Sequence, residues 1–294
     1  MDKYPILKKI FAVLAILGLV MAAYLLWARP YQLRWGATDA EVNKPMPGDE
    51  LDSHPTFLAT RAITIDGTPQ QIWPWLIQMG YTRAGFYGYD ILENIGSPRG
   101  LESAVTIIPE FQQFKVGDKV PISSAATMVF NGVEPNRYLI WSGKDGKGGF
   151  TWALFPLDAS HTRLVSRIRW THHWAQPGLL AFDLFTEFSD HIAVRKVLQG
   201  VKGRVENHIE PMALGTLEFA IYLASALIFL AAMILNLLRP LTRRGWFLGL
   251  AAGASWLVTW YAPLPIWIGA LLELIVLWGL FTAVRRLPLR KEVL

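Results

Sequence analysis

The stretch RLVSRIRWTHHWAQPGLLAFDLFTEFSDHIAVRKVLQGVKGRVEN, residues 163–207, contains a strand that leads into a long helix. In its first part, apolar side chains such as Leu164 and Ile168 alternate with arginines such as Arg167. This period of two predicts a strand over residues 163–171 with one apolar face and one arginine-rich face. From about residue 179 to 207 the period changes to 3.6, which predicts a helix with one buried stripe. The stripe contains Val194, Leu198, Val201 and Val205.

Upstream residues predict the partners of this strand. Five further stretches, separated by turn signals, have the composition of strands: residues 57–65, 115–122, 127–133, 137–142 and 149–157. Two short helices are predicted at residues 69–79, where Thr68 caps the start and Pro69 opens the first turn, and at residues 89–95. Because consecutive strands follow one another with no long helix between them, the sequence predicts an α+β domain with an antiparallel sheet.

This order of elements is that of the helix-grip (START/Bet v 1-like) fold, in which a curved sheet wraps a long C-terminal helix. The chain resembles the START-like superfamily called SRPBCC, often labelled polyketide cyclase/dehydrase-like, in a bacterial membrane-anchored form. The pieces that carry the resemblance are RWGATDAEV (34–42), ATRAITID (59–66), IWPWLIQMG (72–80), GFYGYDILEN (85–94) and FKVGDKV (114–120). The resemblance covers residues 34–206. It implies an apolar cavity that binds a hydrophobic small molecule or lipid, with enzymatic activity in only some members.

Four apolar stretches flank this domain, at residues 10–28, 212–238, 246–262 and 266–284. A bilayer core requires about 20 apolar residues in a helix, so the sequence predicts four transmembrane helices. The first is expected to be a retained signal anchor, because its apolar part is longer than the roughly 7–15 residues of a cleaved signal peptide. The predicted domains are residues 1–29 (anchor), 30–210 (ligand-binding domain) and 211–294 (three further spans).

Basic residues mark one end of the predicted spans. They are Lys3, Lys8, Lys9, Arg239, Arg243, Arg244, Arg285, Arg286, Arg290 and Lys291. Positive residues mark the cytoplasmic side, so both termini are expected in the cytoplasm and the central domain outside the plasma (inner) membrane. Residues 30–212 hold 17 Lys and Arg against 19 Asp and Glu, whereas the whole chain has a net charge of +5. The basicity therefore belongs to the membrane segments, and no nucleic-acid partner is expected.

Several classes of chemistry have no support in the sequence. The chain has no cysteine, which excludes thiol catalysis and disulfides. It also lacks a nucleophile-elbow GxSxG, a Walker A loop, a GxGxxG after a strand and an HExxH helix. No cofactor and no metal are expected.

The long helix carries Glu187, Asp190 and His191 in line with its apolar stripe, and His172 and His173 lie just upstream. A carboxylate and an imidazole four residues apart share a helix face, so these residues are candidates for a metal or acid–base site. That interpretation favours the alternative function, a cyclase- or hydratase-type enzyme. The other interpretation is that they hydrogen-bond the sheet or pair with Arg167 or Arg169.

A second polar cluster follows the first short helix: Tyr87, Tyr89, Asp90, Glu93 and Asn94. These residues either form a pocket mouth that binds a ligand's head group or simply cap the second short helix. Tryptophans of the domain are expected in the core, some of them lining the ligand cavity. The predicted ligand-binding residues are Trp73, Tyr87, Tyr89, Trp141, Trp152, Arg167, Glu187, Asp190 and His191. Within the spans, Glu218 and Glu273 are candidates to hydrogen-bond Ser255 or Thr259, or to reach the outer interface.

Overall fold

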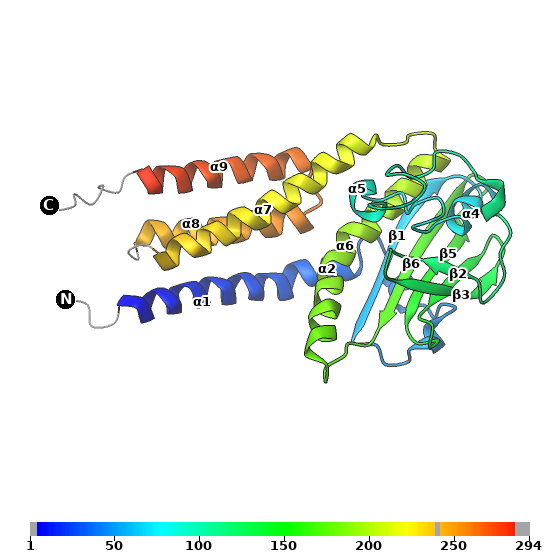
Figure 1. Ribbon diagram of the computed structural model, residues 1–294, viewed down its shortest axis with the longest axis horizontal. Helices are drawn as coiled ribbons and strands as arrows, with labels where there is room; N and C mark the ends of the chain where they lie inside the picture. Colours follow the sequence, from blue (N-terminus) through cyan, green and yellow to red (C-terminus); the bar gives the residue numbers. More distant parts are fainter. Residues whose placement is uncertain (1–4, 239–241, 286–294) are drawn as a thin grey trace. The chain divides into compact units, whose positions relative to one another are not determined.

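The computed structural model describes residues 5–238 and 242–285. The chain divides into two compact units. One, Gln32–Thr216, contains the sheet, and the other is formed by the helical segments that precede and follow it in the sequence (Figure 1).

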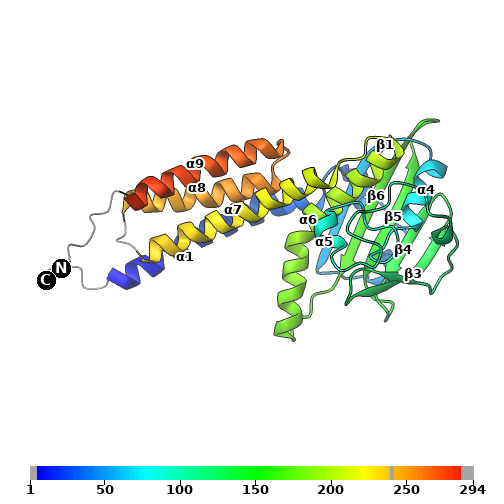
Figure 2. The same ribbon diagram turned by 45° about the horizontal axis from the view of Figure 1, so that its top comes forward.

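The first unit is built on a six-stranded antiparallel sheet, as predicted. Its strands are β1 (Phe57–Asp66), β2 (Lys119–Pro121), β3 (Thr127–Glu134), β4 (Tyr138–Ser142), β5 (Gly149–Pro156) and β6 (His161–Trp170). Their order is β1-β6-β5-β4-β3-β2, so the first strand lies beside the last (Figure 2). β1 and β6 pair along their full length, from Phe57 opposite Trp170 to Asp66 opposite His161. The chain thereby brings residues a hundred positions apart to the same edge of the sheet.

The long helix α6 (Pro177–Val205) packs on one face of the sheet together with α4 (Pro69–Ile77). The predicted stripe is confirmed: Val194, Leu198 and Val201 are buried in one cluster with Leu164 of β6. Each such side chain stabilises the fold by roughly 1.5–3 kcal/mol. α6 ends where Asn207 adopts φ 58° and the His208 N–H donates to the Gly203 carbonyl at 2.7 Å. Such a reversal satisfies a carbonyl that the helix end would leave unpaired.

The opposite face of the sheet is covered by the segment between residues 34 and 52, which contains α3 (Asp39–Asn43) and the 3-10 turn Asp49–Leu51. On this face the arginines of β6 form ion pairs. Arg163 Nε donates to Glu41 Oε1 at 2.7 Å, and Arg167 Nη1 donates to Asp49 Oδ2 at 2.9 Å. α5 (Asp90–Glu93) and the 3-10 turn Pro109–Phe111 lie in the long connection between α4 and β2.

The second unit contains α1 (Pro5–Ala23), most of α7 (Met212–Leu238), α8 (Arg243–Tyr261) and α9 (Ile266–Arg285). A π-helical turn, Tyr24–Ala28, joins α1 to α2 (Arg29–Leu33) without a break. Among the described residues, three helical segments are long and apolar enough to cross a membrane: Ile6–Leu33, Met212–Leu238 and Ile266–Arg285. The prediction of four such segments was therefore wrong by one, because α8 is not among them.

The composition of α8 explains this difference. It begins with Arg243 and Arg244, and many of its later residues are small or polar because they face other helices. A Cβ at Gly253 would lie 2.4 Å from a methyl group of Val20 in α1, so only glycine allows this approach. Ser255 donates to Glu273 Oε1 of α9 at 2.7 Å, which confirms the expected partner of that carboxylate. Small and polar residues hold helices together inside a bundle, and they lower the mean hydropathy on which a span is recognised.

Candidate functional site

A cavity of about 110 Å³ lies beside the second half of α6, at the polar cluster that follows α4. The residues that line it are Tyr87, Gly88, Asp90, Lys196, Gln199, Gly200, Gly203, Arg204, His208, Glu210, Pro211, Met212 and Gly215. The volume accommodates a small polar group or a few water molecules. Met212 and Gly215 belong to the first turn of α7, so the cavity is lined in part by the start of a candidate membrane span.

Tyr87 is fixed in place on one side of the cavity. It adopts φ 68°, an uncommon conformation for a residue other than glycine. Its hydroxyl donates to the Trp75 carbonyl at 3.1 Å and accepts from Gln78 Nε2 at 2.9 Å, and burial raises its pKa well above the ordinary value. α6 approaches closely because Gly200 has no side chain: a Cβ there would lie 1.9 Å from the Tyr87 carbonyl oxygen.

Two buried cations of α6 reach the cavity. Lys196 Nζ lies 2.6 Å from Glu210 Oε1 and 5.5 Å from the ring centre of Tyr89. The Arg204 guanidinium stacks on the Tyr87 ring at 4.1 Å and donates from Nε to the Ala104 carbonyl at 2.8 Å. Both side chains are therefore held with their charges next to the open space, where donors for an anionic or oxygen-rich group are in place.

Two carboxylates of α5 complete the polar surroundings. Asp90 accepts from the Ser103 N–H at 3.1 Å, and Glu93 accepts from the Gly88 N–H at 3.0 Å. Burial raises the pKa of Glu93 to about 7, helped by the charge of Asp90 and opposed by hydrogen bonds from Tyr89 and Gly88. Glu93 therefore titrates near neutral pH beside the cavity.

The structure separates the predicted ligand-binding residues into distinct places. Tyr87 lines the cavity, and Tyr89 is buried beside it against Lys196. Trp73, Trp141 and Trp152 lie in the core between α6 and the sheet, where the rings of Trp141 and Trp152 are 5.6 Å apart. Among the described residues neither Trp141 Nε1 nor Trp152 Nε1 has a hydrogen-bond partner, although both are buried. Because buried polar groups in proteins are almost always hydrogen-bonded, an acceptor is expected for each of these two N–H groups.

The other three predicted residues of α6 lie away from the cavity, where the helix is closed against β1 and the segment that follows β6. Asp190 forms a buried ion pair with Arg61 of β1, and not with Arg167 or Arg169. Glu187 Oε2 lies 3.5 Å from His172 Nε2. His191 is fully buried, and burial together with the nearby Arg61 and Arg195 holds its pKa well below the ordinary value. Within the described part of the chain, no group of three His, Asp or Glu side chains is placed to hold a metal ion.

Arg167 lies on the far face of the sheet from α6. Its guanidinium donates to Thr60 Oγ1 at 2.9 Å, to Asp49, and to the carbonyls of residues 41, 42 and 44. These contacts fasten the segment that covers this face. They leave its side chain remote from both the aromatic core and the cavity.

Sequence reasoning missed Lys196, Arg204, His208 and Glu210 as residues of the cavity. One signal was available, since Gly200 and Gly203 interrupt the helical pattern of α6. A glycine inside a helix costs about 1 kcal/mol relative to alanine, which indicates close approach of another segment. That signal indicates a close approach at this part of α6, but it identifies neither Tyr87 nor the charged side chains around it.

No family model matches the chain, and no curated protein matches it. The central domain is similar in structure to several solved proteins. One is a Polyketide_cyc-like protein from Corynebacterium glutamicum, at 18% identity, covering 52% of this chain and 93% of that one with a TM-score of 0.29. Another, from Arthrobacter aurescens, is 13% identical, with coverage of 56% and 92% and a TM-score of 0.29. A conserved protein of unknown function from Enterococcus faecalis is 15% identical, with coverage of 52% and 81% and a TM-score of 0.29. The fold itself is defined by the strand order and by α6.

Proposed function

We propose that this chain is a membrane-anchored binding protein for a lipid or another hydrophobic molecule, whose polar head group occupies the cavity between Tyr87, Lys196 and Arg204. The observation that carries the proposal is the position of the cavity at the first turn of α7. α7 has 27 residues, about 40 Å at 1.5 Å per residue, which exceeds a hydrocarbon core of about 30 Å. Its first residues therefore extend into the head-group region.

The chemistry of the cavity supports a head group that carries a negatively charged oxygen. Lys196 supplies three N–H donors and Arg204 a planar guanidinium, the two groups that bind phosphate and carboxylate oxygens most strongly. Asp90 and Glu210 on the same wall provide acceptors for hydroxyl or amine groups. Donors and acceptors around one small space fix orientation, while affinity comes from the apolar part of the ligand, at roughly 0.8 kcal/mol per buried methylene.

We place that apolar part against the aromatic core between α6 and the sheet. Trp75 packs edge-on against Tyr87 with ring centres 6.0 Å apart, so the aromatic core begins directly behind the cavity. Trp141 and Trp152 lie further along this core, and their free N–H groups are donors that an oxygen of the ligand would satisfy.

We further propose that the domain lies outside the plasma membrane, with the basic ends of α1, α8 and α9 on the cytoplasmic side. Within the helical unit, Ile16 of α1 lies near Gly249 and Val20 near Gly253, so α1 and α8 run parallel. Arg244 donates to Thr282, near the end of α9, so α8 and α9 run antiparallel. The start of α1, the start of α8 and the end of α9 therefore lie together, and their basic residues favour the cytoplasmic side. Lys3, Arg239, Arg286, Arg290 and Lys291 lie outside the described residues.

Acid–base catalysis by Glu187, Asp190 or His191 has less support than binding. The Asp190 carboxylate is engaged by Arg61, and His191 is fully buried with a lowered pKa. A general acid or base must reach a substrate proton, and these groups are enclosed by protein. The cyclase- or hydratase-type function is therefore the weaker alternative.

The test of the binding function is lipid analysis of the full-length protein purified from membranes in mild detergent. Gly215→Leu extends a side chain into the cavity, since a Cβ there is at ordinary contact distance, 3.5 Å, from Glu210. Gly18→Leu is the matched control, because nothing lies within 4 Å of a Cβ at that position of α1. Mass spectrometry should detect a lipid or metabolite enriched over the bulk membrane in the wild type and Gly18→Leu, and lost in Gly215→Leu. Extracts that match the bulk membrane in all three proteins would overturn the proposal.

A further inference from the structure

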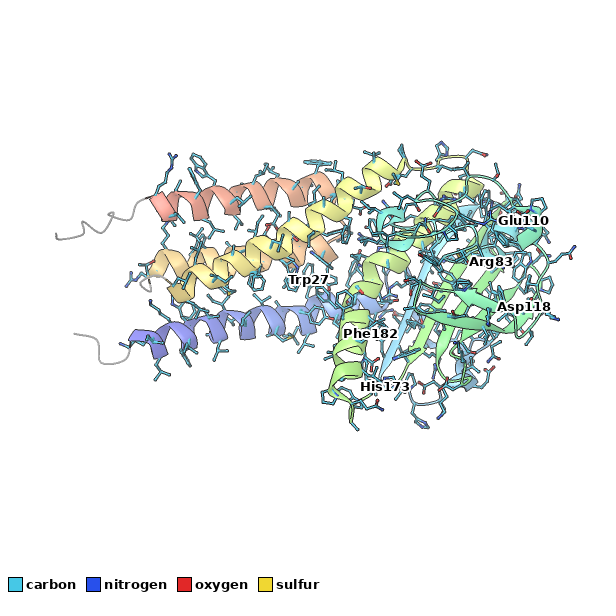
Figure 3. The ribbon with its side chains drawn as sticks, viewed as in Figure 1. Trp27, Arg83, Glu110, Asp118, His173 and Phe182 are labelled. Atoms are coloured by element: carbon cyan, nitrogen blue, oxygen red, sulfur yellow. The ribbon has the colours of Figure 1, made fainter. Side chains whose placement is uncertain are left out.

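The first half of α6 exposes apolar side chains along most of its circumference. From Pro177 to Phe185 every exposed residue is apolar or glycine. We call five of the exposed side chains here and just upstream the aromatic face: Trp174 (62% exposed), Leu179 (44%), Phe182 (60%), Leu184 (49%) and Phe185 (65%). Phe182 lies on α6, and His173 lies in the short segment just before it (Figure 3).

The acidic side chains of the same half of the helix point the other way. Asp183, Glu187 and Asp190 are buried, with exposures of 2%, 6% and 6%. Asp183 accepts from Trp170 Nε1 at 3.1 Å and pairs with His173 Nδ1 at 2.9 Å, so it is bound within the domain. A helix at a water-exposed surface has the reverse arrangement, with carboxylates outside and phenylalanines inside. We therefore expect these exposed apolar side chains to contact an environment other than water.

The chain itself indicates which environment covers the aromatic face. The domain is preceded by one segment long enough to span a membrane, Ile6–Leu33, and followed by another, Met212–Leu238. Only residues 206–211 separate the end of α6 from the start of α7. A domain attached at both ends to membrane spans stays at the lipid surface. Phenylalanine, leucine and tryptophan without exposed charge are the composition of a helix face that enters the interface.

We infer that the aromatic face inserts into the lipid interface, with the first half of α6 lying at the boundary of head groups and acyl chains. This contact is distinct from the proposed ligand cavity, which lies at the other half of α6, and it does not depend on any ligand. It would hold the domain in one orientation on the membrane.

The absence of cysteine from the sequence permits a direct test on the full-length chain. A nitroxide is attached at Phe185→Cys, and separately at Phe182→Cys, in protein reconstituted into vesicles of phosphatidylcholine and phosphatidylglycerol. Leu26→Cys, on an 82% exposed position of the first apolar segment, is the lipid reference, and Lys144→Cys, on an exposed turn, is the water reference. Collision with oxygen, which concentrates in lipid, and with a water-soluble nickel chelate is measured by electron paramagnetic resonance.

The labels at 182 and 185 should collide with oxygen almost as often as the label at 26, and with the nickel chelate far less often than the label at 144. Collision rates at both positions that match those at 144 would show that the face is in water and overturn the inference. Protection from both reagents, with dipolar broadening between labels, would show that a second copy of the chain covers the face and would overturn it equally.

Discussion

The two halves of α6 differ in what surrounds their buried charged side chains. In the first half, Asp183 and Asp190 are buried and bound to His173 and Arg61, so their charges are enclosed within protein. In the second half, Lys196 and Arg204 are also buried, but their charges border a cavity of about 110 Å³. One helix therefore contains charges that are enclosed by the domain and charges that border an open space.

This difference separates residues with a structural role from residues with a binding role. A buried ion pair gains little net stability over an apolar replacement, but the loss of one partner is costly because the other charge stays buried. A charge beside a cavity keeps access to water, and its loss costs binding more than folding. Polar residues on a helix face in the sequence do not reveal which case applies. Substitutions on the two halves should therefore have contrasting effects.

The largest effect is expected for Asp190→Ala. It leaves the Arg61 guanidinium buried without its carboxylate, which should lower the free energy of unfolding by about 3–5 kcal/mol. In a domain of this size that corresponds to a decrease of roughly 6–20 °C in melting temperature. Thermal unfolding of the full-length protein in detergent measures the change.

The matched control is Glu134→Ala, which removes an exposed pair with Arg137 and should cost at most about 1 kcal/mol. The double substitution Arg61→Leu with Asp190→Leu should recover much of the stability, because it leaves no charge unpaired. Equal melting temperatures for Asp190→Ala and Glu134→Ala would show that the first half of α6 is not sealed as described.

A smaller effect, with a defined dependence on pH, is expected at Glu93. Its pKa is about 7 in the folded domain, against an ordinary 4.5, so folding favours the protonated form. The stabilising contribution is complete below pH 4.5 and is lost as the pH rises through 7. At pH 8 the loss approaches about 3 kcal/mol, at 1.36 kcal/mol for each pH unit between the two pKa values.

Glu93→Gln should therefore raise the melting temperature at pH 8 and have little effect at pH 4.5. Melting temperatures across this pH range, with the exposed Glu102→Gln as a control, test the sign. A variant that loses stability at pH 8 would show that Glu93 is needed as the anion, as a partner of Arg204 or of a bound ligand.

Lys196→Gln should affect binding more than folding. Its partner Glu210 is about half exposed, so the pair contributes at most about 1 kcal/mol to stability. A charge-assisted hydrogen bond to a ligand contributes about 1.5–3 kcal/mol, which corresponds to a loss of roughly ten- to a hundredfold in affinity. Lys202→Gln is the control on the same helix, since Lys202 pairs with Glu206 at 2.7 Å, away from the cavity. Equal lipid enrichment in the two variants would remove Lys196 from the site.

The fold was largely predictable from the sequence because it depends on local periodicity. The predicted bounds of β1, β3, β4 and β5 lie within a residue or two of those observed, and α6 begins and ends within two residues of its prediction. The count of membrane spans failed at α8, where glycines and serine that suit helix contacts reduce hydropathy. In α8, the residues that suit close packing against other helices also make the segment less apolar than the other three.

The candidate site was less predictable because its partners come from distant segments. Asp190 pairs with Arg61, and not with Arg167, because β1 lies beside β6 and the two arginines point to opposite faces of the sheet. The alternation of residues along a strand predicts which side chains share a face of the sheet. It does not predict the order of the strands, and that order determines which arginine lies beside Asp190. The cavity likewise joins α6 to Tyr87 and to the start of α7, three segments that no local pattern connects.

The smallest effect is expected for Trp152→Phe. The loss of roughly 40 Å³ of side chain costs about 1 kcal/mol, while removal of a buried N–H with no partner among the described residues gains about the same. The net change in the free energy of unfolding should lie within about 1 kcal/mol. Trp170→Phe is the control, because its indole N–H donates to Asp183 at 3.1 Å and its loss leaves that carboxylate short of a donor. A cost at Trp152 as large as that at Trp170, together with a loss of the enriched lipid, would mean that Trp152 donates to the ligand. The binding role would then extend from the second half of α6 into the aromatic core.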